Sequence, residues 1–68
     1  MTRTFKYNLS QKVYDLYRTN PPSHAGSQMS NNYFNGFNGL RCFGDRGSQC
    51  YAAWCAGVDN AKGASDFA

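Results

Sequence analysis

Side chains that could do covalent or metal chemistry are few in this 68-residue chain. Its three cysteines stand as C-x7-C-x4-C at Cys42, Cys50 and Cys55, and His24 is its single histidine. Zinc sites commonly use a C-x2-C pair, which fixes two ligands on adjacent turns, and nucleophilic catalysis needs a base beside the nucleophile. We therefore expect no metal, no cofactor and no enzymatic activity. Cys42 beside Arg41 is the one thiol whose position suggests a lowered pKa.

The more suggestive chemistry is a short segment that combines cations with an aromatic ring. Arg41, Phe43 and Arg46 lie in LRCFGDRGS at 40–48, where glycines interrupt both helical and strand periodicity. Guanidinium groups neutralise phosphates, and exposed rings stack on unpaired bases, so this loop favours folded or single-stranded RNA as a ligand. Lys12 and Arg18 are further candidates for phosphate contacts.

The aromatic side chains around this loop have a second interpretation, in which they build the core. We expect core positions for Phe37, Tyr51 and Trp54, while Phe34 and Phe43 stay open between core and interface. The net charge of +3 is equally ambiguous. It fits a nucleic-acid surface, and it fits an ordinary solvated basic surface.

Three helices are expected to position these residues. Ser10 can cap a helix at about 11–19, which Pro21-Pro22 ends. Ser27 or Ser30 can cap a second helix at 28–39, with Gly39 at its end. Ser48 can cap a third helix from Gln49 to about Lys62, with Gly63 at its end, and residues 1–9 read as a short extended arm.

Small residues in the second and third helices predict a close crossing. Ala52, Ala53, Ala56 and Gly57 give the third helix a flank almost without side chains, and Gly36 and Gly39 could supply the facing backbone. We therefore expect an all-α fold, a small domain of two to three helices that cross closely at glycine and alanine contacts.

The segments NYFNGFNG at 32–39 and WCAGVDNA at 54–61 resemble the ribosome modulation factor family. In that family one helix ends in aromatic-x-x-Gly-x-x-Gly, a polar loop carries Cys-Pro-aromatic, and a second helix carries Trp-x-x-Gly-hydrophobic-x-x-Ala. The matching positions are Tyr33, Gly36, Gly39, Cys42, Trp54, Gly57, Val58 and Ala61. Phe43 replaces the proline, the loop looks shorter, and Val58 stands where an aromatic residue is usual.

The resemblance implies a protein that docks on the bacterial small ribosomal subunit, near the end of its RNA where messages are positioned, and silences translation. Arg41, Arg46, Lys12 and Arg18 would then contact phosphates, while Tyr33 and Trp54 would hold the helices together. On this view 1–9 is an N-terminal arm, 10–26 an accessory helix and linker, and 27–68 a helical hairpin like that of the family.

Other partners stay open at this stage. A phage-type inhibitor or adaptor that binds and blocks a host protein would also use exposed aromatic and basic side chains. A homodimer is a further alternative, because so short a chain has a thin core. No apolar run approaches the roughly 20 residues that span a bilayer, and the N-terminus lacks the apolar stretch of a secretory signal. We therefore expect a cytoplasmic protein without a membrane partner.

Overall fold

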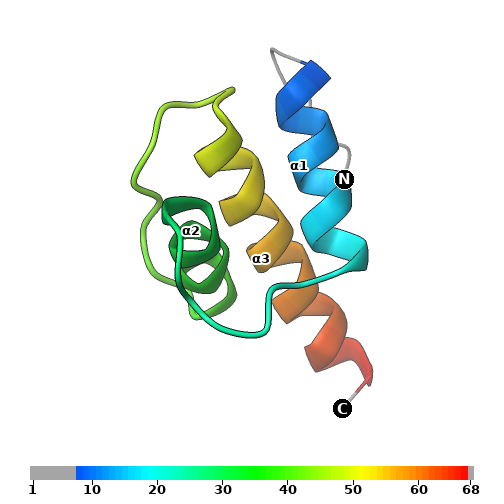
Figure 1. The fold of residues 1–68 in the computed structure, drawn as a ribbon. Coiled ribbons are helices and arrows are strands. Elements are labelled where there is room, and N and C mark those ends of the chain that lie inside the picture. The colour runs from blue at the N-terminus through cyan, green and yellow to red at the C-terminus, as the bar shows by residue number, and fades with distance from the viewer. Residues whose placement is uncertain (1–7, 68) are drawn as a thin grey trace.

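The computed structural model describes the backbone of residues 8–67 and the side chains of residues 8–63. Over this range the chain forms three helices, α1 (Asn8–Thr19), α2 (Gln28–Phe37) and α3 (Gln49–Phe67). Helix α3 packs against both of the others and lies between them (Figure 1). The expected all-α fold is confirmed. No helix in the described range is long and apolar enough to cross a membrane.

Helix α1 begins at Asn8, three residues before the expected start. The expectation that Ser10 caps this helix is wrong, because Ser10 lies inside it and is buried. Its hydroxyl donates instead to the carbonyl oxygen of Gly47, at 2.5 Å. That bond ties the first turn of α1 to the segment just before α3. Residues 1–7 of the expected extended arm lie outside the described residues. Its last two residues, Asn8 and Leu9, are helical, so that part of the expectation is wrong.

Helix α2 begins where its capping signal predicts and ends two residues early. The Ser27 side chain accepts a hydrogen bond from the Ser30 amide at 3.1 Å, which confirms the N-cap. The last helical residue is Phe37, and Gly39 follows with φ +76°. Leu40 donates its amide to the Asn35 carbonyl and Gly39 to that of Gly36, the paired bonds of a Schellman motif.

Helix α3 also begins as expected, because the Ser48 hydroxyl accepts from the Tyr51 amide at 3.2 Å. The expected end near Lys62 and Gly63 is wrong, since the helix continues to Phe67. Gly39 and Gly47 are the glycines with positive φ in the described part of the chain. Gly63 therefore does not adopt the left-handed conformation by which a glycine closes a helix.

The crossing of α2 and α3 is built on a reciprocal pair of glycines. A Cβ atom on Gly36 would overlap the carbonyl oxygen of Trp54, and one on Gly57 would overlap that of Tyr33. Each glycine thus faces the backbone of the residue three positions before the other glycine. The close approach expected from the sequence is confirmed for this pair. It is wrong for Gly39, which has nothing within 4 Å and instead serves the turn after α2.

The core consists mostly of small side chains from α3. Ala52, Ala53 and Ala56 are fully buried, and they form one cluster with Val13 of α1 and Tyr33 of α2. This arrangement follows from the central place of α3, because both of its flanks are covered and only small side chains fit between closely spaced helices. Tyr51 and Trp54, for which we expected core positions, are only half-buried, as are Val58 and Ala61.

Two polar contacts hold α1 against α3 beside this cluster. The Tyr14 hydroxyl donates to the Asp59 carboxylate. The Asn60 amide nitrogen donates to the Tyr17 carbonyl at 3.0 Å and to the Tyr33 hydroxyl at 2.9 Å. Asn60 therefore joins all three helices through one side chain.

Candidate nucleic-acid interface

The loop between α2 and α3, residues 38–48, carries the basic and aromatic side chains singled out in the sequence. A loop of this length without its own secondary structure needs side chains elsewhere to fix its course. Three such anchors are present, and they lie near its start, its middle and its end. These anchors fix the backbone of the loop and determine which of its side chains face solvent.

The central anchor is Asn32 of α2, whose side chain is 1% exposed. Its Oδ1 accepts the Phe43 amide at 2.8 Å, and its Nδ2 donates to the Phe43 carbonyl at 3.4 Å. The same Nδ2 donates to the Gln28 carbonyl at 2.9 Å, which fixes the rotamer of the asparagine within its helix. Both backbone groups of Phe43 are thereby held from the core side.

The anchor near the start of the loop is Trp54 of α3. Its indole Nε1 donates to the Leu40 carbonyl at 2.8 Å. The Trp54 ring is stacked on that of Tyr51, with centroids 6.0 Å apart and an interplanar angle of 20°. Both rings are half-buried, and the indole hydrogen bond links α3 to the start of the loop.

The anchors at the end of the loop surround Ser48. Its hydroxyl donates to the Asp45 carbonyl at 2.6 Å, and its amide donates to the same oxygen at 3.1 Å. Gly47 has φ +86°, a conformation that a side chain would strain, and its carbonyl receives the Ser10 hydroxyl. The loop therefore enters α3 through a tight turn that also contacts α1.

The side chains left outside by these anchors are those with binding chemistry. Phe43 is 62% exposed, and Arg41 and Arg46 are exposed on either side of it. Leu40 is exposed as well, and Asp45 is the one acidic side chain of the loop. The question that the sequence left open for Phe43 is thus answered, because its ring faces solvent.

Lys12 and Arg18 are exposed on α1 but are not brought together. Six residues separate them, which is about 9 Å along the helix axis and a rotation of about 120°. Lys12 is near the end of α1 that the Ser10–Gly47 bond joins to the loop. Arg18 lies in the last turn, at the opposite end of α1 (Figure 1). Arg18 therefore does not belong to the same basic surface as Arg41 and Arg46.

The three thiols differ in burial. Cys42 and Cys50 are half-buried and Cys55 is fully buried. Burial, aided by the neighbouring Cys55 and Cys50, raises the pKa of the Cys42 thiol, the opposite of the lowering expected from Arg41. Among the described residues no group of three histidine, cysteine, aspartate or glutamate side chains is placed to hold a metal ion.

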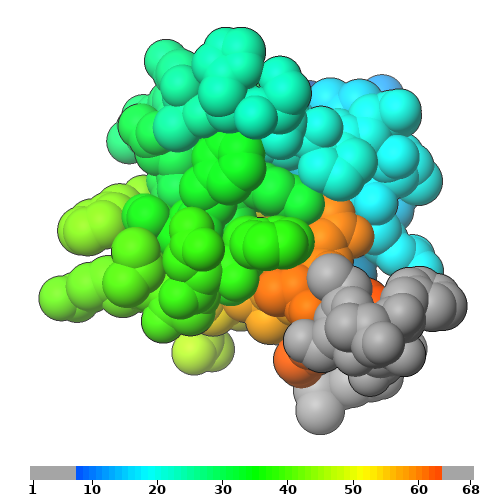
Figure 2. Space-filling model, turned by 90° about the horizontal axis from the view of Figure 1, so that it is seen from below, coloured from blue at the N-terminus to red at the C-terminus, as the bar shows by residue number. Residues whose placement is uncertain are grey.

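A second concave site was not predicted from the sequence. A pocket of about 490 Å³ is formed by the linker between α1 and α2, the end of α2 and the later turns of α3. Figure 2 shows these three segments side by side on one face of the molecule. It is lined by Pro21, Pro22, Tyr33, Phe34, Phe37, Asn60 and Gly63. The linker prolines and Asn60 had no motif to mark them, because the pocket joins residues up to 42 positions apart in the chain.

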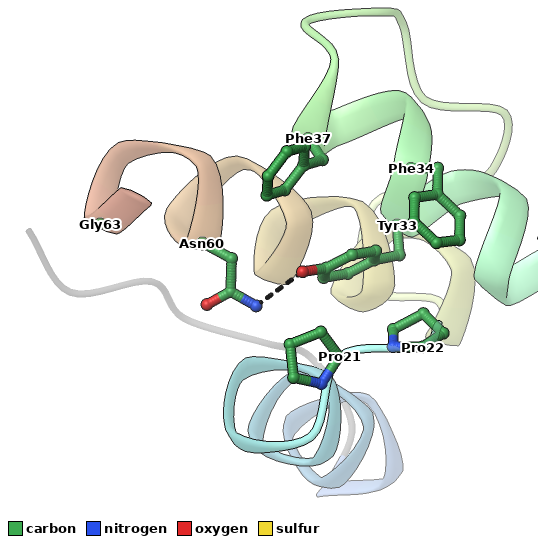
Figure 3. A pocket seen from close by; sticks show the side chains of 7 residues that line it. All are labelled: Pro21, Pro22, Tyr33, Phe34, Phe37, Asn60 and Gly63. Carbon is green, nitrogen blue, oxygen red and sulfur yellow. Dashed lines mark hydrogen bonds between the residues drawn. The ribbon is translucent and has the colours of Figure 1, made fainter. Parts of the chain in front are cut away.

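The aromatic side chains of this pocket differ in burial. Tyr33 is 2% exposed and forms part of its floor, Phe34 is half-buried, and Phe37 is 41% exposed. The expectation that Phe37 belongs to the core is therefore wrong, since its ring lies at the open edge of the pocket, where the α3 residues in the lining are Asn60 and Gly63. In Figure 3 Phe37 and Phe34 lie above Tyr33, the two prolines lie below it, and the Asn60 amide reaches the Tyr33 hydroxyl from α3.

Over the described residues, the fold and these sites define a small all-α protein with a basic-aromatic loop anchored by side chains and an aromatic pocket. No family model, curated protein or solved structure matches the chain.

Proposed function

We propose that this protein is a non-catalytic factor that binds structured RNA, that its target is the bacterial small ribosomal subunit, and that its binding silences translation. The observation that carries the proposal is Phe43, a ring 62% exposed on a backbone fixed from within by a buried asparagine, between two exposed arginines. The resemblance of residues 32–61 to the ribosome modulation factor family supports the choice of target.

The Phe43 ring is exposed on a loop whose backbone is anchored. A phenylalanine ring left in water gives up the gain it would make on burial, and that gain is available to a ligand that covers the ring. A ring presented in this way stacks on an unpaired base without losing loop entropy on binding. Arg41 and Arg46 would bind the flanking phosphates.

The test is a binding titration with an RNA hairpin that carries an unpaired loop, repeated over a range of salt concentrations. Affinity falls as salt rises, so the slope of log affinity against log salt is negative. Replacing an arginine that binds a phosphate with glutamine should make this slope less steep by about 1. We expect this result for Arg41→Gln and for Arg46→Gln. Arg18→Gln is the matched control and should leave the slope unchanged, because Arg18 lies at the far end of α1.

The alternative is a phage-type inhibitor or adaptor that binds a host protein. The exposed Leu40 beside Phe43 favours it, because two apolar side chains on one loop also suit a protein interface. An affinity for RNA that is weak and identical in all the arginine variants would overturn the RNA proposal and leave this alternative as the better one.

A further inference from the structure

We propose that the pocket lined by Tyr33, Phe34, Phe37 and Asn60 receives one unstacked nucleobase, and that it prefers bases with an exocyclic amino group. The inference deepens the proposed function and rests on it, since the base would come from the same RNA that the loop binds. The pocket is separate from the loop. It opens beyond Phe37, on the side of α2 that faces the linker and α3 (Figure 3).

The walls of the pocket suit a flat aromatic ligand. Phe37 presents an exposed ring at the rim, with its centroid 6.1 Å from that of Tyr33. Phe34 stands nearly perpendicular to Tyr33, at 84°, and closes another side. Rings in these positions offer both a face and an edge to a base, and base–aromatic stacking is the common means by which proteins hold unpaired nucleotides.

The polar groups of the pocket are selective. Both hydrogens of the Asn60 amide are used, by the carbonyl of Tyr17 and the hydroxyl of Tyr33. These bonds fix the amide orientation, because the Tyr17 carbonyl can only accept. Within the described part of the chain, Oδ1 of Asn60 has no hydrogen-bond donor, and Figure 3 shows it turned away from Tyr33. It is therefore an acceptor suited to an amino group.

The Tyr33 hydroxyl complements this acceptor. Its oxygen accepts from Asn60, which leaves its own hydrogen for a ring nitrogen. Adenine and cytosine both present an amino group next to an unprotonated ring nitrogen, whereas uracil presents carbonyl oxygens and a protonated nitrogen. A purely aliphatic ligand would satisfy neither Oδ1 of Asn60 nor the hydroxyl hydrogen of Tyr33 and is disfavoured for that reason.

One exposed cation lies next to a lining residue in the chain. Lys62 immediately precedes Gly63 and is exposed. Its charge can attract the phosphate beside a bound base.

The inference is tested by NMR titration of the isotope-labelled full chain with 5′-mononucleotides, up to about 10 mM because single-base affinities lie in the millimolar range. AMP and CMP should shift the Asn60 side-chain amide and the ring signals of Phe37, and UMP should do so more weakly. Ribose 5-phosphate carries the sugar and phosphate without a base and should leave these signals in place. Equal shifts with ribose 5-phosphate, or none with any nucleotide, would overturn the inference.

Two matched variants separate this inference from the proposed function. Phe37→Leu should weaken AMP binding about five- to tenfold, because it removes a stacking face while keeping an apolar side chain. Phe43→Leu should leave AMP binding unchanged and weaken binding of the RNA hairpin. If AMP binding survives Phe37→Leu unchanged, the pocket assignment is wrong even where the loop binds RNA. If neither variant affects hairpin binding although AMP still binds the pocket, the proposed function fails instead.

Discussion

Asn32 holds Phe43 by both of its backbone groups, accepting the Phe43 amide at 2.8 Å and donating to its carbonyl at 3.4 Å. The asparagine is almost wholly buried while the phenylalanine ring is exposed. A buried polar side chain that satisfies a loop backbone leaves the loop side chain free to point outward. The relationship explains how so short a chain can display an aromatic ring in a fixed position.

Replacement of Asn32 by alanine should therefore affect both stability and RNA binding. The variant removes the partners of the Phe43 amide and carbonyl, which should cost about 1–3 kcal/mol of unfolding free energy. Thermal unfolding measures the first effect, and RNA titration below the melting transition measures the second. Asn31→Ala is the matched control, since Asn31 is exposed on the same helix, and it should change neither. An Asn32→Ala protein with wild-type affinity would show that the fixed loop is not needed for binding.

The glycine at position 57 should be intolerant of any side chain. Because a Cβ atom there would overlap the Tyr33 carbonyl oxygen, Gly57→Ala should lower the unfolding free energy by about 1–3 kcal/mol or more as the helices move apart. Differential scanning calorimetry reads this as a drop of roughly 4–8 °C in Tm per kcal/mol.

Gly63→Ala, in the same helix, should stabilise the protein. Nothing lies within 4 Å of the position its Cβ would take, and alanine is favoured over glycine in a helix by about 0.5–1 kcal/mol. Its Tm should rise. If the Tm of Gly57→Ala rose as well, the two helices would not be in backbone contact.

Gly39 should be limited by conformation and not by space. Its φ of +76° is costly for a residue with a side chain, although nothing lies within 4 Å. Gly39→Ala should lose about 1–2 kcal/mol of unfolding free energy, while Gly26→Ala in the linker, with open space and no positive φ, serves as its control. Equal melting temperatures for the two variants would argue against the Schellman turn that begins the loop.

Cys42 should react slowly with alkylating reagents at neutral pH. Its pKa is raised above the ordinary value, mainly by burial, so the nucleophilic thiolate is scarcer at a given pH than it is in the unfolded chain. The rate of iodoacetamide modification at Cys42, followed by mass spectrometry of its peptide, should show its midpoint above that of the urea-unfolded chain. A midpoint below that of the unfolded chain would mean that Arg41 governs the thiol after all.

The parts of the fold that follow from local signals could be predicted from the sequence. Ser27 and Ser48 cap their helices because a hydroxyl before a helical stretch accepts an amide of the first turn. Gly36 and Gly57 mark a close approach because no other residue permits it. Ser10 carries the same local signal as the two caps, but a contact 37 positions away determines its bond, and no local pattern reveals that contact.

The candidate sites were predictable to different degrees. The basic-aromatic composition of the loop is visible in the sequence, whereas the anchor Asn32 is not, because an asparagine in a helix has no distinctive spacing. The pocket was missed for the same reason, since Asn60 bonds to residues 27 and 43 positions away. Burial of Phe37 was wrongly predicted because helical periodicity identifies the apolar face of a helix but does not show which residues of a neighbouring helix pack against that face.

The central claim is tested most directly by sedimentation of the tagged protein through sucrose gradients of bacterial lysate, with and without ribonuclease. We predict that the wild-type chain migrates with small-subunit particles or ribosome dimers, that ribonuclease abolishes this, and that the double variant Arg41→Gln, Arg46→Gln stays at the top of the gradient while Arg18→Gln follows the wild type. Migration with a ribonuclease-resistant protein, unchanged in the double variant, would contradict the account.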